Sequence, residues 1–155
     1  MVCHDSGVIH RDLKLENVLF TTTAHRKVKV VDFGIAGMCK GGQGEINDAM
    51  TLRYATPEML KSSNSKANPS QDVWTIGIML YAMLFNSMPF DGSTKDQIKD
   101  SIIKQSVKIP KYAPVTNEVA EFISFCLDKD ANKRIMCKDM IVHPWMMMSD
   151  DDLED

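Results

Sequence analysis

The chain has 155 residues, a length that fits a single domain. Hydrophobic residues make up 44% and charged residues 25% of the sequence, as in globular proteins, so the composition excludes disordered and collagen-like chains. The net charge of −3 gives no reason to expect nucleic-acid binding.

The N-terminus and the apolar segments favour an intracellular, cytoplasmic protein without a membrane anchor. Met1–Ser6 lacks the apolar core of a signal peptide. The longest apolar stretch, Val73–Phe85, has 13 residues, whereas a membrane span needs about 20, so we expect a buried helix there. The four cysteines form no C-x-x-C pair and are typical of reduced thiols, not of a disulfide framework or a zinc site.

Short strands and loops are predicted for the first half of the chain. Residues 17–20 and 27–31 are strand-like runs separated by the polar residues 21–26. Residues 37–48 contain four glycines and predict a loop.

The second half of the chain predicts helices. Pro57 fits the first turn of a short helix, and Ser70 is the predicted N-cap of the buried apolar helix. Isoleucines recur at helical spacing within residues 94–105, and apolar residues form one face within 118–127, which Thr116 would cap. A last short helix is predicted around residues 138–142 and ends at His143-Pro144.

Four polar residues in the first half suit phosphoryl transfer from a nucleotide. Asp12 and Lys14 precede the first predicted strand, Asn17 begins it, and Asp32 follows the second, so a hairpin could bring them to one edge. Asn17 and Asp32 offer oxygen ligands for Mg²⁺. The Asp12 carboxylate could orient an attacking hydroxyl and accept its proton, and the Lys14 ammonium could neutralise charge on the transferred group.

His10–Asn17 and Asp32-Phe33-Gly34 resemble the catalytic loop and the metal-binding motif of the eukaryotic protein kinase family. The Lys two residues after Asp12 is the pattern of serine/threonine kinases. Further landmarks of the family follow in order: Thr56-Pro57-Glu58, with Thr where Ala is usual, then Asp72–Gly77, Met88-Pro89-Phe90, Arg134-Ile135 and His143-Pro144-Trp145. The last of these, with the surroundings of Trp74, is similar to the calcium/calmodulin-dependent and AMP-activated group.

The resemblance implies a serine/threonine kinase that uses ATP and Mg²⁺ and acts on protein substrates. Asp12 would be the catalytic base, with Lys14 and Thr51 beside it, and Asn17 and Asp32 would bind the metal. Nucleotide contacts would come from Glu16, Leu19 and Asp32, with Met79 and Met83 behind Leu19. Regulatory or structural roles would fall to seven residues: His10, Arg11, Phe33, Gly34, Glu58, Asp72 and Arg134.

Two contacts between distant segments follow from the same resemblance. Phe33 and His10 would stack on each other, anchored by Asp72. Glu58 and Arg134 would form a buried ion pair, which must be complete because removing one partner of such a pair typically costs about 3–5 kcal/mol.

The implied fold is the large C-terminal lobe of a kinase, mainly α with a short β-hairpin. It would cover residues 1–146 and be followed by an acidic tail at 147–155. The resemblance implies that the small N-terminal lobe is missing from these 155 residues, because no G-x-G-x-x-G motif precedes the expected catalytic loop and Met1–Ser6 resembles the end of a helix. A missing N-lobe or a regulatory subunit would then complete the site. The alternative function is a non-catalytic lobe that docks substrates or regulators.

The activation loop departs from the family pattern. Arg11 would usually pair with a phosphorylated residue of that loop. Residues 35–50 contain no Ser, Thr or Tyr. Glu45 or Asp48 could supply a fixed carboxylate to Arg11 instead, or both could be solvated loop charges.

Overall fold

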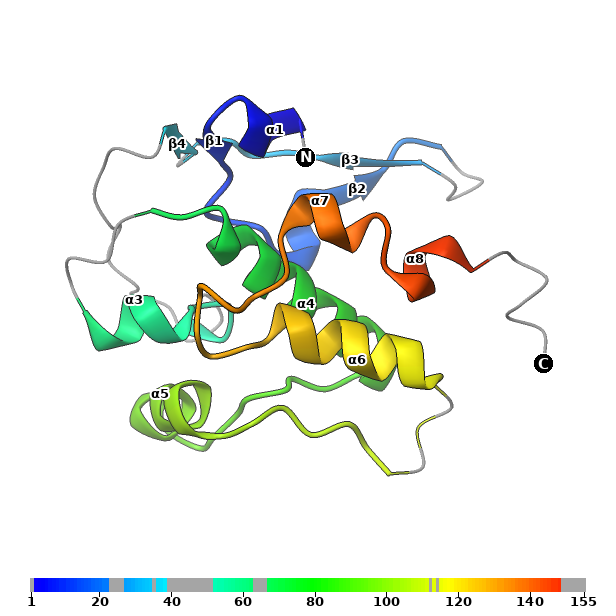
Figure 1. The fold of residues 1–155 in the computed structure, drawn as a ribbon. Coiled ribbons are helices and arrows are strands. Elements are labelled where there is room, and N and C mark those ends of the chain that lie inside the picture. The colour runs from blue at the N-terminus through cyan, green and yellow to red at the C-terminus, as the bar shows by residue number, and fades with distance from the viewer. Residues whose placement is uncertain are drawn as a thin grey trace.

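The computed structural model describes residues 2–22, 27–34, 36–38, 52–62, 67–111, 113 and 115–148. Strands lie on one side of the molecule and the longer helices on the other (Figure 1). The elements before residue 50 are α1 (Val2–Asp5), β1 (Val8–Ile9), the 3-10 helix η1 (Leu15–Asn17), β2 (Val18–Phe20), β3 (Val28–Val30) and β4 (Gly37–Met38). Those after it are α3 (Pro57–Lys61), α4 (Ser70–Phe85), α5 (Lys95–Lys104), α6 (Asn117–Cys126), α7 (Cys137–Met140) and α8 (Pro144–Met147).

Two small antiparallel sheets form from the first half of the chain. Strand β2 pairs with β3, and Leu19 lies opposite Lys29 at the centre of that pair. Both strands lie within the runs predicted for them. Strand β1 pairs with β4, where Ile9 lies opposite Gly37. The prediction of a loop from residue 37 is therefore wrong for 37–38, because a strand of two residues carries no alternation that the sequence could reveal; residues 39–48 lie outside the described residues.

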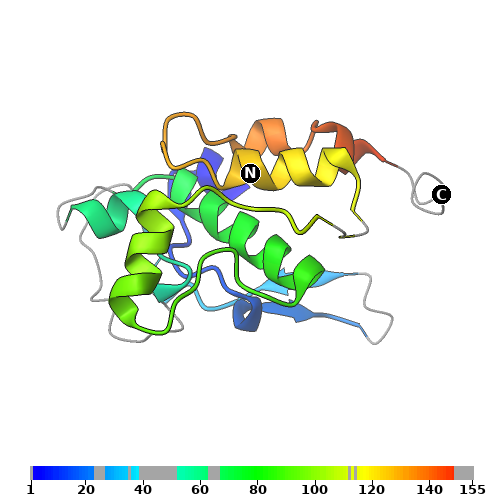
Figure 2. The same cartoon turned by 90° about the horizontal axis from the view of Figure 1, so that it is seen from below.

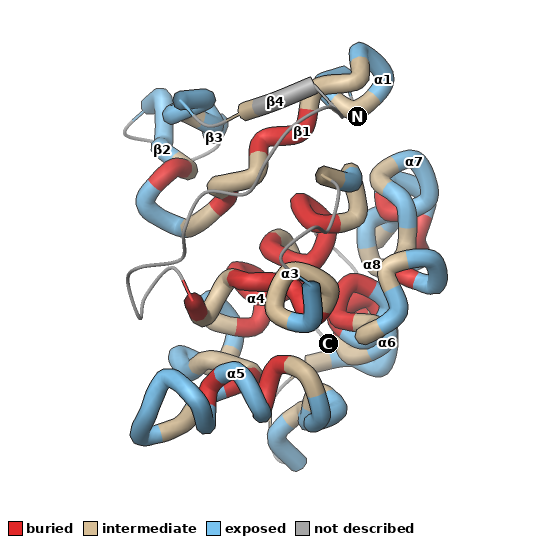
Figure 3. The backbone as a smooth tube through the Cα atoms, turned by 90° about the vertical axis from the view of Figure 1, so that its left-hand side faces the viewer, coloured by how far each residue is buried: buried red, intermediate tan, exposed pale blue. Residues whose placement is uncertain are grey.

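Helix α4 is the centre of the hydrophobic core. It runs between the strands on one side and α6 on the other (Figure 2), and ten of its residues are buried. Trp74 and Ile78 are fully buried, and burial follows the inner faces of α5 and α6 as well (Figure 3). The apolar stretch is thus a core helix, as its length predicted. Within the described residues, no helix combines the length and apolar character that crossing a membrane requires.

The start of α4 differs from the prediction. Ser70 is the first helical residue and Pro69 precedes it, so Ser70 is not the N-cap. The backbone N–H of Ser70 instead donates to Asn68 Oδ1 at 3.0 Å. Asn, Ser and Asp can all accept such a bond at a helix start, and the sequence pattern alone did not separate Asn68 from Ser70.

Threonine hydroxyls cap three of the other helices. Thr56 accepts the Met59 N–H before α3, Thr94 accepts the Gln97 N–H before α5, and the predicted cap Thr116 accepts the Val119 N–H before α6. Pro57 occupies the first turn of α3, as predicted. These local contacts satisfy N–H groups that have no partner within their own helix.

The C-terminal helices were only partly predicted. Helix α7 covers Cys137–Met140, close to the predicted 138–142. Helix α8 is absent from the prediction: His143-Pro144 predicts the end of a helix, whereas in the structure Pro144 is the first residue of a new one, a position that suits Pro equally well. His143 supports that start by accepting the Trp145 N–H on Nδ1 at 3.3 Å.

Candidate functional site

A carboxylate on α4 holds the loop that follows β1. The backbone N–H groups of His10 and Arg11 donate to the two oxygens of Asp72, each at 2.9 Å. His4 Nε2 lies 2.7 Å from one of the same oxygens. Arg11 has a φ of 70°, in the left-handed region that residues with a Cβ rarely adopt. The buried carboxylate therefore fixes a strained turn directly before Asp12.

The buried ring of His10 links this loop to the segment after β3. His10 Nε2 lies 3.1 Å from the carbonyl oxygen of Val31, and His10 Nδ1 accepts the Asp12 N–H at 3.3 Å. This pair of bonds requires the proton on Nε2. The ring also contacts Phe33, with 4.5 Å between the ring centroids, so the predicted contact of His10 with Phe33 and its anchoring by Asp72 are present.

Asp12, Lys14 and Asn17 meet around one carboxylate. Lys14 Nζ lies 3.1 Å from Asp12 Oδ2. Asn17 Nδ2 donates to the Asp12 carbonyl oxygen at 2.8 Å and to Asp12 Oδ2 at 3.3 Å. The hydrogen bond with Asp12 is the largest cause that raises the pKa of Lys14; burial opposes it, and the charges of Asp12, Glu16 and Asp32 add to the rise. Lys14 is therefore a firmly charged ammonium beside the Asp12 carboxylate.

Asp32 comes from the neighbouring strand. The Val31 N–H donates to the Asn17 carbonyl oxygen at 2.9 Å, which places the residue after Val31 next to the end of η1. Asp32 has a φ of 63° and is exposed, and its Oδ1 accepts the Gly34 N–H at 3.2 Å. A Cβ at Gly34 would lie 3.0 Å from that oxygen, so the turn leaves little room for a larger residue there.

The donor atoms of Asn17 and Asp32 fit a magnesium ion better than a transition metal. Because Asn17 uses its Nδ2 for Asp12, its Oδ1 is left for another partner, and no described residue donates to it. Asp32 offers one exposed carboxylate. Within the described part of the chain, no three His, Cys, Asp or Glu residues gather as a metal cluster. An amide oxygen and a single carboxylate match Mg²⁺, which usually keeps waters and phosphate oxygens as its other ligands.

The surface beside these residues is apolar. Leu19 on β2 is 49% exposed, Met83 near the end of α4 is 63% exposed, and Met79 is buried in the core. Glu16 is exposed next to the buried Asn17. Other exposed apolar side chains on β2, β3 and the segment after β3 are Phe20, Val28, Val30 and Phe33. We call these residues, together with Leu19 and Met83, the sheet-side apolar surface; within the β2–β3 pair, Leu19 lies on one face beside Lys29, and Phe20, Val28 and Val30 lie on the other.

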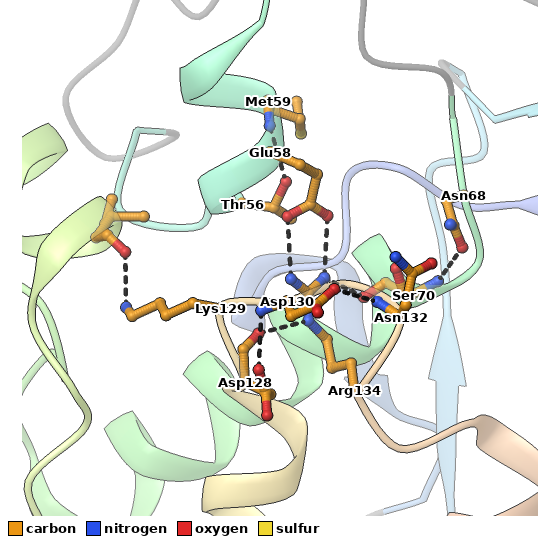
Figure 4. Close-up of polar contacts among 11 residues, drawn as sticks. Thr56, Glu58, Met59, Asn68, Ser70, Asp128, Lys129, Asp130, Asn132 and Arg134 are labelled. Atoms are coloured by element: carbon orange, nitrogen blue, oxygen red, sulfur yellow. Dashed lines mark hydrogen bonds and ion pairs between the residues drawn. The ribbon is translucent and has the colours of Figure 1, made fainter.

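The predicted ion pair between Glu58 and Arg134 is present (Figure 4). The two terminal nitrogens of Arg134 donate to the two Glu58 oxygens at 3.0 Å each. Arg134 also donates to the carbonyl oxygens of Ser70 and Asp128. The Arg134 side chain is fully buried, whereas 23% of the Glu58 side chain is exposed. This one guanidinium joins α3, the start of α4 and the loop after α6.

Sequence reasoning missed two residues next to the site. His4 shares the Asp72 carboxylate with the loop before Asp12. Tyr54 lies near the same loop. Its pKa is raised, chiefly by burial and further by the charge of Glu16, while a backbone hydrogen bond with Leu15 lowers it. No motif marked either residue, since their neighbours are distant in sequence. Thr51, Glu45 and Asp48 lie outside the described residues.

Comparisons with known proteins indicate one family for nearly the whole chain. The family model of the protein kinase domain matches residues 1–146. The chain is 31% identical over 152 residues to calcium-dependent protein kinase 22 of Oryza sativa subsp. japonica, covering 96% of this chain and 26% of the rice protein. It is 33% identical over 144 residues to the probable serine/threonine-protein kinase MARK-A of Dictyostelium discoideum, covering 93% of this chain and 13% of that protein.

A third relative is also named as a serine/threonine-protein kinase. The chain is 33% identical over 148 residues to the serine/threonine-protein kinase kin-29 of Caenorhabditis elegans, covering 96% of this chain and 17% of the relative. The chain thus spans about a quarter or less of the length of these three curated relatives.

Proposed function

Because the chain belongs to the protein kinase family, we propose that it is the C-terminal lobe of a serine/threonine kinase. It would serve transfer of the γ-phosphoryl group of Mg-ATP to Ser and Thr hydroxyls of protein substrates. The observation that carries this proposal is the Asp12 carboxylate, which lies within 3.3 Å of both Lys14 Nζ and Asn17 Nδ2. Asp32 follows the adjacent strand. The serine/threonine names of the relatives support the substrate class.

Each residue of the site has a specific task in this proposal. Asp12 orients the substrate hydroxyl and accepts its proton as the oxygen attacks. Lys14, whose pKa is raised by Asp12, keeps a positive charge where negative charge develops. Asn17 and Asp32 would hold Mg²⁺ by their oxygens. Bound Mg-ATP supplies the phosphoryl group, and Thr51 would contact Asp12 and Lys14.

The sheet-side apolar surface is where the nucleotide base would lie. Leu19 presents an exposed side chain there, and Glu16 and Asp32 offer carboxylates nearby. An N-lobe or a regulatory subunit would cover the other side of the nucleotide. Since positioning supplies much of the rate in phosphoryl transfer, we expect the 155 residues alone to transfer phosphate far more slowly than a complete site.

A docking role without catalysis is the second candidate. The sheet-side apolar surface favours it, because exposed apolar patches commonly mark interaction sites. In that case the chain would bind a kinase substrate or regulator and would bind no nucleotide.

Phosphate transfer from labelled Mg-ATP to a mixed pool of Ser/Thr peptides tests the proposal. The 155-residue chain is assayed beside Asp12→Asn, which keeps the shape of the side chain but removes the base. Label that appears with the native chain and falls at least about a hundredfold with the variant supports the kinase. Partner binding without label and without Mg-ATP binding favours the docking role. Label that is unchanged in Asp12→Asn contradicts the assigned base.

A further inference from the structure

The ring of His143 lies at the contact between α8 and α6. Helix α8 lies beside α6 in two perpendicular views (Figure 1 and Figure 2). His143 directly precedes α8 and is 6% exposed. Its ring lies edge-on to those of Phe122 and Phe125 on α6, with 5.1 and 5.9 Å between the centroids. Trp145 of α8 packs against the same Phe122 ring at 4.9 Å. One imidazole therefore contributes to both the start of α8 and its seat on α6.

The imidazole can cap α8 in only one of its two charge states. His143 Nδ1 accepts the Trp145 N–H at 3.3 Å, so Nδ1 carries no proton and the neutral ring holds its proton on Nε2. A doubly protonated ring has no acceptor atom, so its Nδ1–H would oppose the Trp145 N–H and the cap would be lost. Histidine is the side chain that ordinarily changes its charge between pH 5 and 8.

The other ring nitrogen is buried without a hydrogen bond. His143 Nε2 has no hydrogen-bond partner, and Glu121 Oε2 lies 3.8 Å away, within ion-pair distance but too far for a hydrogen bond. The Glu121 side chain is 57% exposed, so it can receive the ring at the surface. An imidazolium in the observed position would leave both of its N–H groups without a hydrogen bond, which is costly in a buried site. An outward movement toward Glu121 removes that cost.

Two carboxylates of α6 act on the ring. Glu121 is one of them, and Glu118 lies three residues before it. The pKa of Glu118 is lowered chiefly by hydrogen bonding to its own backbone N–H and to the cap of α6, and the charge of His143 adds to that effect. Helix α7 contributes Lys138 and Asp139, both exposed, and within the described part of the chain Asp139 is not within ion-pair distance of the ring. Helix α8 carries no charged side chain. The acidic side of α6 thus favours a charged ring that has moved outward.

We propose that His143 is a pH-sensitive latch between α8 and α6. At pH above neutrality the neutral ring caps α8 and stays among the aromatic rings of α6. When acid adds the second proton, Nδ1 no longer accepts the Trp145 N–H and the imidazolium moves outward to Glu121. Helix α8 then loses its cap, and the contact of Trp145 with Phe122 is released. The inference does not rest on the proposed kinase function.

Opening of the latch would enlarge an apolar surface that is already present. Phe125 is 44% exposed and Val142 is 65% exposed, on either side of His143 in the contact between α6 and the turn after α7. Phe122 is 2% exposed in the closed arrangement and Trp145 is partly exposed. Release of α8 therefore gives solvent access to two further aromatic rings, which fluorescence can report.

Hydrogen exchange of the Trp145 amide at pH 5.5, 6.5 and 7.5 tests the proposal, with His143→Asn as the matched control. Asn is a good N-cap whose side-chain oxygen can accept the Trp145 N–H, but it does not titrate. A comparison of the two chains at each pH removes the intrinsic pH dependence of exchange. We expect rates equal within about twofold at pH 7.5 and about fivefold or faster exchange in the native chain at pH 5.5. Glu121→Gln, an exposed substitution, should shift this rise to lower pH.

Two outcomes of the exchange experiment would overturn the proposal. One is a ratio of native to His143→Asn rates at Trp145 that is the same at pH 5.5 and 7.5. The other is an equal rise at the Gln105 amide, which is bonded to the Ser101 carbonyl oxygen at the distant end of α5, since acid would then loosen the whole chain.

Quenching of tryptophan fluorescence by acrylamide provides an independent measurement. Trp74 is fully buried, so quenching gained at pH 5.5 reports on Trp145. The native chain should gain more quenching than His143→Asn between pH 7.5 and 5.5. An equal gain in the two chains would refute the opening of α8.

Discussion

Gly77 on α4 and Cys126 on α6 approach so closely that no side chain fits between the two helices. A Cβ added at Gly77 would lie 2.7 Å from Cys126 Cβ and 2.9 Å from Leu127 Cδ2. Gly77 is buried, and Cys126 is fully buried. The contact sets the distance between the two helices that form the centre of the core.

Gly77→Ala should therefore destabilise the chain although Ala is the better helix former. Overpacking in a core typically costs about 1–3 kcal/mol, which exceeds or offsets the gain of about 1 kcal/mol from helix propensity. Urea unfolding measures the change. Ser124→Ala, on the exposed face of α6, serves as the control and should shift stability by less than about 0.5 kcal/mol. A stabilised Gly77→Ala chain would contradict the close packing.

Glu58→Ala should be far more damaging than an ordinary surface change. It leaves the fully buried Arg134 side chain without its carboxylate, and breaking such a pair costs about 3–5 kcal/mol. The double variant Glu58→Leu with Arg134→Met removes both charges and should recover part of that loss. Thermal and urea unfolding report both effects. A loss below about 1 kcal/mol in Glu58→Ala would mean that solvent replaces the partner.

Asp72→Asn should release the turn before Asp12. The amide keeps one acceptor oxygen, so one of the two backbone N–H groups of His10 and Arg11 loses its partner. We expect a loss of about 2 kcal/mol or more and faster hydrogen exchange at these two amides. The matched control is Asp100→Asn on the exposed face of α5. Unchanged exchange at His10 and Arg11 would show that the turn does not depend on the carboxylate.

Stability should rise with pH above neutrality because of Lys129. Burial lowers its pKa to about 7 in the folded chain from 10.5 ordinarily, so between these values the unfolded chain binds more protons. Burial raises the pKa of Cys126 to about 12 from 9.0, which lowers stability again as pH rises above about 9. The free energy of unfolding should thus be compared between pH 7 and 8.5. Lys129→Met should flatten the rise, and an unchanged slope in that variant would contradict the assignment.

The sequence predicted those elements of the fold whose formation depends on residues adjacent in the chain. The β2 and β3 strands, the threonine cap of α6, and the proline start of α3 follow from propensity and capping over a few residues. Sequence patterns failed for β4, for the N-cap of α4 and for α8. Strand β4 has only two residues, Asn68 and Ser70 were equally suited to the start of α4, and Pro144 was equally suited to ending one helix or beginning the next, so the local sequence signal was ambiguous.

The candidate site shows the same division. The residue types and spacing of Asp12, Lys14, Asn17 and Asp32 indicated phosphoryl transfer, because that chemistry needs a base, a cation and oxygen ligands for a metal close to one another. The resemblance to kinases also named the Glu58–Arg134 pair. No motif named His4, which shares Asp72 with the loop before Asp12, or the Lys129 contact with Ile102.

The sequence by itself therefore determined the chemical inventory, the family and the helix that becomes the core. The tertiary structure alone decided which charges are buried, how closely α4 and α6 pack, and how far the pKa of Lys129 falls. Burial and electrostatic interaction depend on distance in space, and residues 27 to 76 positions apart become neighbours only when the chain has folded.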